Sequence, residues 1–83
     1  MYFRIINFTL LAPSLWAMIS QFKSEKKENL KVIKIADNKG IIIESFSNSS
    51  EAGKSTKVLA AMQSLKSQAM AKVLVEEGTS EDQ

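Results

Sequence analysis

Two β-prone runs on either side of a turn constrain the fold of this chain more than any other feature. Residues 30–35 and 41–46 are rich in Ile, Val and Leu, and Asp37-Asn38-Lys39-Gly40 lies between them, with a glycine that can take a positive φ. Such runs around such a turn predict a β-hairpin at about residues 30–46. Ile41, Ile42 and Ile43 are consecutive, a pattern typical of a strand buried on both faces, so we expect a covered sheet.

The N-terminal segment, residues 1–22, is mostly apolar and admits more than one interpretation. Residues 5–22 approach the length of about 20 apolar residues that a spanning helix needs, although Pro13 and polar residues interrupt them. Basic residues flank them on both sides, so this part of the chain could be a signal or a membrane anchor. It could also be a strand over residues 2–10 followed by an amphipathic helix that begins at Pro13. We expect an N-terminal helix, and the anchor stays open.

The second half of the chain carries a helical pattern. Val58, Met62, Leu65 and Ala69 follow helical spacing and predict a long helix at about residues 54–70. The residues after it, Lys72 to Val75, fit either the last helical turn or a short final strand at about 72–76. With the hairpin and the N-terminal helix, this pattern predicts an α/β or α+β fold.

The charge pattern divides the chain further. Residues 23–29 are predicted to be a charged linker, residues 30–77 one small α/β unit, and residues 78–83 a disordered polar tail.

The composition excludes several kinds of chemistry. The chain has 83 residues, which is enough for one small domain with a modest core. It contains no Cys and no His, so it has no disulfide, no thiolate metal site and no Ser/His/Asp or Cys/His nucleophile. The net charge of +2 is too small to indicate nucleic acid as a partner. We therefore expect a binding protein rather than an independent enzyme.

One short motif indicates a candidate binding site. Gly53-Lys54-Ser55-Thr56 lies between the strand predicted at residues 40–46 and the helix that follows. A strand, a turn, these four residues and a helix are the local order of a phosphate-binding loop, because loop amides and a helix N-terminus then face the same anion. The same four residues also fit plain capping of an alanine-rich helix, with Ser55 or Thr56 as the cap.

The chain here resembles the MinD/ParA-like and bacterial tyrosine-kinase-like branch of P-loop nucleotidases. The matching segments are residues 41–43, Ala52-Gly53-Lys54-Ser55-Thr56, Leu59-Ala60-Ala61 and Lys72-Val73-Leu74-Val75, the last in place of the family's second strand. The resemblance implies that Gly53, Lys54, Ser55 and Thr56 bind the phosphates of ATP, and that the Ser55 hydroxyl binds magnesium.

The loop departs from the full motif. Asn48 stands where the motif has its first glycine, and Ser49, Ser50 and Glu51 occupy the places of the variant's signature lysine and glycines. The resemblance therefore implies a degenerate or truncated nucleotide-binding module without independent hydrolysis.

A second resemblance leads to a different class of function. The order helix, strand, glycine turn, strand, helix is similar to the roadblock/LC7 family, through residues 32–45 and Leu59-Ala60-Ala61-Met62. That resemblance implies a small scaffold that dimerises or binds a protein partner, and Gly53 to Thr56 then carry no chemistry. A membrane-anchored adaptor, held by residues 5–22, is the remaining alternative. We expect a cytoplasmic location, with membrane association left open.

Overall fold

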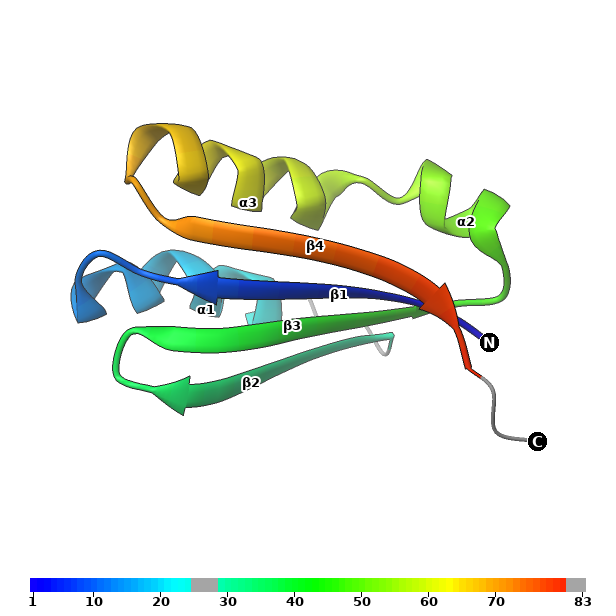
Figure 1. The fold of residues 1–83 in the computed structure, drawn as a ribbon, viewed down its shortest axis with the longest axis horizontal. Helices are drawn as coiled ribbons and strands as arrows, with labels where there is room; N and C mark the ends of the chain where they lie inside the picture. Colours follow the sequence, from blue (N-terminus) through cyan, green and yellow to red (C-terminus); the bar gives the residue numbers. More distant parts are fainter. Residues whose placement is uncertain (25–28, 81–83) are drawn as a thin grey trace.

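The computed structural model describes residues 1–24 and 29–80, without the side chains of residues 21–24. The chain forms, in order, strand β1 (Tyr2–Thr9), a short 3-10 helix (Pro13–Leu15), helix α1 (Trp16–Ser24), strands β2 (Leu30–Ala36) and β3 (Lys39–Phe46), helices α2 (Ser49–Lys54) and α3 (Lys57–Gln68), and strand β4 (Lys72–Thr79) (Figure 1).

The four strands form one antiparallel sheet in the order β2-β3-β1-β4. The first strand lies inside the sheet and pairs with β3 on one side and β4 on the other, with Ile5 opposite both Ile43 and Glu76. Strands β3 and β4 therefore run in the same direction but are separated by β1. This is the split βαβ, or ferredoxin-like, arrangement.

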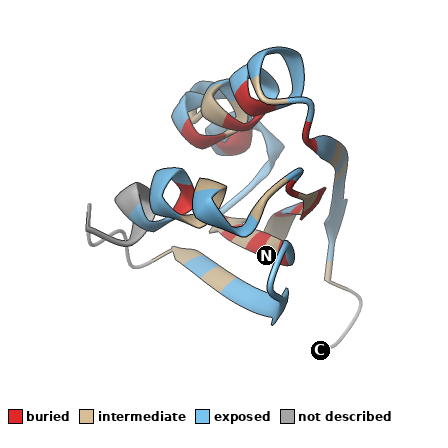
Figure 2. Cartoon of the chain, turned by 90° about the vertical axis from the view of Figure 1, so that its left-hand side faces the viewer, coloured by how far each residue is buried: buried red, intermediate tan, exposed pale blue. Residues whose placement is uncertain are grey.

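The helices cover one face of the sheet, and the hydrophobic core lies between them and that face (Figure 2). The strands contribute Ile6, Phe8 and Ile42, which alternate with residues of the opposite face. The helices contribute buried residues at helical spacing: Ile19 from α1, and Val58, Met62 and Leu65 from α3.

The predicted fold class is wrong, because the molecule is built on a four-stranded antiparallel sheet with short helices. The chain begins with a strand, not with a helix, and this strand is central in the sheet. An amphipathic helix does follow Pro13, as the alternative interpretation of residues 1–22 held. In the part of the chain that the structure describes, no helix is long and apolar enough to cross a membrane.

The long helix predicted at residues 54–70 is shorter in the structure, where α3 covers Lys57–Gln68. A separate helix, α2, precedes it, and the two are broken at Ser55 and Thr56. The break has a physical cause. The Arg4 side chain donates hydrogen bonds to the carbonyl oxygens of Ala52 and Ser55, at 2.7 Å each, so the guanidinium satisfies acceptors that lie at the break. Gly53, a poor helix former, lies next to the break.

The hairpin of β2 and β3 lies where the sequence predicts it, but Gly40 has a different role. Gly40 is in β3 and does not take a positive φ. A Cβ atom at this position would lie 2.7 Å from the Ile33 carbonyl oxygen and 2.7 Å from the rings of Phe8 and Trp16. The missing side chain therefore allows Trp16 to pack against the sheet, edge-on to Phe8.

The final strand is longer than predicted. It includes Gly78 and Thr79, which the sequence assigns to a disordered tail, and the Ser80 amide donates to the Met1 carbonyl. Residues 81–83 of that tail and residues 25–28 of the predicted charged linker lie outside the described residues. Of the remaining linker residues, 23 and 24 belong to α1. Asn29 lies in a turn and forms hydrogen bonds with the backbone of Ser45.

Candidate functional site

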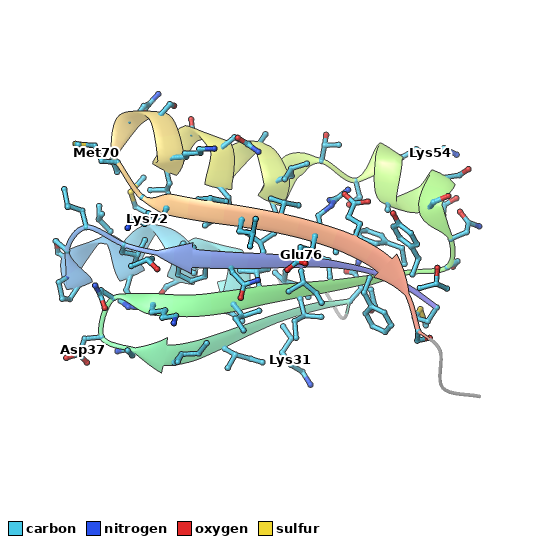
Figure 3. The ribbon with its side chains drawn as sticks, in the orientation of Figure 1. Lys31, Asp37, Lys54, Met70, Lys72 and Glu76 are labelled. Atoms are coloured by element: carbon cyan, nitrogen blue, oxygen red, sulfur yellow. The ribbon has the colours of Figure 1, made fainter. Side chains whose placement is uncertain are left out.

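The motif at residues 53–56 lies where α2 ends and α3 begins. Gly53 and Lys54 are the last residues of α2, Ser55 is its C-cap, and Thr56 is the N-cap of α3 without a side-chain cap bond. The Lys54 side chain is 76% exposed at the C-terminal end of α2 (Figure 3), with its Nζ atom 3.9 Å from a Glu51 carboxylate oxygen. The four predicted site residues are thus adjacent in space only because they are consecutive in the chain.

A buried arginine organises the backbone beneath this motif. Arg4 comes from β1, is only 2% exposed, and donates to Glu44 of β3 at 3.2 Å and to Glu77 of β4 at 3.1 Å. It also holds the Ala52 and Ser55 carbonyl oxygens, and its guanidinium carbon lies 5.2 Å from the centre of the Phe46 ring. A guanidinium can donate several hydrogen bonds at once. Arg4 of β1 therefore connects carboxylates of β3 and β4 to backbone carbonyl oxygens at the end of α2.

The outer end of this cluster is a tyrosine–carboxylate pair. The Tyr2 hydroxyl donates to Glu77 at 2.7 Å. This hydrogen bond, together with the one from Arg4, holds the pKa of Glu77 below its usual value, and the same bond raises the pKa of Tyr2. Both shifts favour an ionised Glu77 and a neutral Tyr2.

The geometry of residues 53–56 does not fit a phosphate cradle. A phosphate loop needs backbone amides that converge on one anion. Here residues 49–54 are helical, the Ser55 amide donates to the Ala52 carbonyl, and two carbonyl oxygens of the region face Arg4. Asn48 caps α2 by accepting the Glu51 amide at 2.9 Å, which is structural capping chemistry. Binding of ATP and of magnesium at Ser55 stays a prediction.

A second candidate surface is the side of the sheet that faces away from the helices, which we call the open face. Alternation along the strands places six apolar residues on it: Phe3, Ile5, Ile33, Ile41, Ile43 and Leu74. Ile5 is 36% exposed, Ile33 39% and Leu74 60%. No described helix covers this face, although antiparallel sheets open to water on one side usually alternate to polar residues there.

The charged residues of the open face lie at its margins, whereas Asn7 and Thr9 are uncharged polar residues on the central strand β1. Lys31 is on the edge strand β2, and Glu76 is on the opposite edge strand β4 (Figure 3). Both belong to one row across the sheet, because Ile5 pairs with Glu76 and with Ile43, and Ile43 pairs with Lys31. The row therefore reads acid, Ile, Ile, base, with the apolar side chains at its centre.

Two shallow hollows flank Phe3 on this face. One, of about 270 Å³, lies on the β4 side and is lined by Ile5, Glu76 and Gly78 among others. The other, of about 420 Å³, lies on the β2 side and is lined by Lys31, Ile43 and Ser45 among others. Phe3 lines both hollows and therefore lies between them.

Comparison of the sequence with protein-family models and with curated proteins finds no match. The fold itself also leaves the function open, because one fold hosts many unrelated activities. The functional argument therefore depends on the surface chemistry described above.

Sequence reasoning missed the open face, yet the signal was present in Ile41, Ile42 and Ile43. Consecutive apolar residues predict a strand that is covered on both sides. Only Ile42 faces the helices and is fully buried, whereas Ile41 and Ile43 are half-buried on the open face. The pattern thus predicts that the open face is also covered, and the described residues do not cover it.

Proposed function

We propose that this chain is a small scaffold or adaptor module that acts through protein–protein contacts on the open face. The observation that carries this proposal is the contiguous apolar surface centred on Ile5 and Ile43. Contiguous apolar patches rimmed by polar residues mark interaction sites on proteins of this size. Depletion of charge at the centre with charges at the margin is also the usual anatomy of an interface.

The chemistry of this face favours protein over nucleic acid. Sheets that bind single-stranded RNA or DNA stack bases on aromatic side chains. Among the described residues of the open face, Phe3 is the one aromatic side chain, and the other apolar residues of that face are aliphatic. Aliphatic surface is suited to packing against another protein's side chains.

Two earlier expectations stay predictions beside this proposal. Helix, strand, turn, strand and helix follow one another from α1 to α3, which is the order of the roadblock-like scaffolds that the sequence resembles. A cytoplasmic location is the other prediction. The proposal gives the chain no catalytic role.

Nucleotide binding is the rival function and has a direct test. Binding of a fluorescent ATP analogue in the presence of magnesium is measured for the wild type and for Lys54→Ala, with Lys66→Ala as a control on the exposed surface of α3. We expect no saturable binding that depends on Lys54, because the local backbone amides do not converge. Saturable binding that disappears only in Lys54→Ala would restore the phosphate-loop interpretation.

The proposal is tested by placing a photo-cross-linking amino acid on the open face in cells. Leu74 and Ile33 are exposed open-face positions, and Gln63, on the exposed side of α3, is the matched control. We expect one discrete protein adduct from positions 74 and 33 and none from 63, and we expect Ile5→Lys to abolish it. If positions 74 and 33 give no adduct, the open face is not an interaction surface.

A further inference from the structure

We propose that the occupant of the open face is the same face of a second copy of this chain, related by a two-fold axis parallel to the strands. The proposal rests on the function proposed above and names its partner. A two-fold interface must be complementary to itself, so residue i of one copy meets residue j of the other and the reverse. The open face meets this condition in charge, in apolar packing and in relief.

Charge gives the first argument. A two-fold axis parallel to the strands places β4 of one copy over β2 of the other, since these are the two edges of the sheet. Within the row that contains Ile5, Glu76 of each copy then lies against Lys31 of the other. Neither side chain has an ion-pair partner within residues 1–24 and 29–80 of its own chain. The dimer therefore forms two equivalent opposite-charge pairs at its margins.

The apolar residues are complementary under the same operation. Ile5 of one copy lies against Ile43 of the other in the centre of the interface. In the next row Leu74 lies against Ile33, and Asn7, the one polar residue of that row, lies against Ile41. Aligned packing of two sheets face to face, about 10 Å apart, interdigitates such side chains.

The relief of the face also fits. The operation places Phe3 of one copy over Ser45 of the other, because Phe3 and Ser45 are paired across β1 and β3. Ser45 is small and lines the hollow of about 420 Å³ on the β2 side. The aromatic side chain of each copy thus has a recess in front of it.

The competing arrangement is a two-fold axis that runs across the strands. It can bring Glu76 against Lys72, but it then seats Ile43 against Lys39 and Ile5 against Thr9. Burying lysine against isoleucine without a partner is costly, so the arrangement with the axis parallel to the strands is favoured.

The area is sufficient for a stable dimer. Four strands of seven or eight residues cover about 19 Å across and about 26 Å along, a flat area of about 500 Å². The accessible surface that follows the side chains is larger, and specific interfaces need at least about 1,000 Å² in total from both partners.

Reciprocal charge reversal, measured by sedimentation equilibrium, tests the proposal. We expect the wild type to be a dimer and expect Lys31→Glu and Glu76→Lys each to weaken self-association about tenfold, because each creates two like-charge pairs. The double variant K31E/E76K regains the wild-type affinity. An equimolar mixture of the two single variants forms a heterodimer, because both of its pairs are again of opposite charge. Both Lys31 and Glu76 are exposed positions, and circular dichroism checks folding.

Lys72→Glu is the matched control, an equal charge change on the same face outside the proposed pair, and it changes the affinity less than threefold. If Lys72→Glu weakens the dimer and Lys31→Glu does not, the axis runs across the strands and the proposal is wrong. A wild type that is monomeric overturns the proposal as well. In that case cross-links from position 74 to a different protein leave the proposed function standing, whereas no cross-links remove both.

Discussion

At the scale of single residues, Arg4 has the largest structural role in this molecule. In the sequence it is one of the basic residues that flank the apolar segment at residues 5–22. In the structure it is buried, and its partners are Glu44, Glu77 and two carbonyl oxygens between 40 and 73 residues away in sequence. No local pattern encodes partners at such separations, so neither the cluster nor the break between α2 and α3 could be predicted.

Removal of the Arg4 guanidinium is predicted to destabilise the fold strongly. Arg4→Met takes the positive charge away from the buried Glu44 carboxylate and the hydrogen bonds away from α2, and we expect a loss of about 3–5 kcal/mol in the free energy of unfolding. Urea denaturation followed by Trp16 fluorescence measures it. Glu77→Gln, which changes only the partly exposed partner, should cost about 1 kcal/mol or less. If Arg4→Met lowered the free energy of unfolding by less than about 1 kcal/mol, the proposed structural role of the Arg4 cluster would be contradicted.

Two glycines give a contrasting pair of predictions from the space around them. Gly40→Ala places a Cβ against a backbone carbonyl and two aromatic rings, so we expect it to cost about 1–3 kcal/mol. Gly53→Ala meets no atom within 4 Å and lies in α2, so it should stabilise by up to about 1 kcal/mol. Thermal melts would resolve both changes, since about 1 kcal/mol shifts the midpoint by about 4–8 °C in a domain of this size. Destabilisation by Gly53→Ala would mean that this glycine has a role the structure does not contain.

At the scale of elements, the sequence predicts what is local and fails on what is distant. The hairpin follows from two β-prone runs and a short turn, and the buried stripe of α3 follows from the spacing of Val58, Met62 and Leu65. The pairing of β1 with both β3 and β4 does not follow, because the hydrophobic pattern of a strand says which face is buried and not which strand lies beside it. That pairing separates β3 from β4 and removes the parallel neighbour that the nucleotidase resemblance required.

The end of α3 offers a prediction at this scale. Met70 follows the helix with φ 57, a left-handed conformation that favours glycine, and its side chain is 73% exposed. Met70→Gly should raise the free energy of unfolding by about 0.5–1 kcal/mol, because relief of the strain exceeds the added entropy of the unfolded chain. Met70→Ala keeps the strain and should give no gain. Equal stabilities for the two variants in chemical denaturation would contradict this explanation.

At the scale of the whole molecule, residues 1–24 and 29–80 leave one face of the sheet without a cover. The consecutive isoleucines of β3 indicate a strand buried on both sides, and the described part of one copy buries only one side. An apolar pattern in a sequence indicates that a strand face is buried, but it does not indicate whether the chain itself or a partner buries it. Both kinds of burial favour the same residue types. The acid-to-base row from Glu76 to Lys31 is the feature from which we propose a second copy of the chain as the partner.

The most direct test of this account is an isotope-filtered NOE experiment on a mixture of methyl-labelled and unlabelled protein, which detects contacts between copies alone. We predict intermolecular cross-peaks from the methyl groups of Ile5 to those of Ile43, because the two-fold axis places these side chains opposite each other. The absence of such cross-peaks, together with strong broadening of the Ile33, Ile41 and Leu74 methyl signals by a soluble paramagnetic agent, would show an open face exposed to water and would contradict the account.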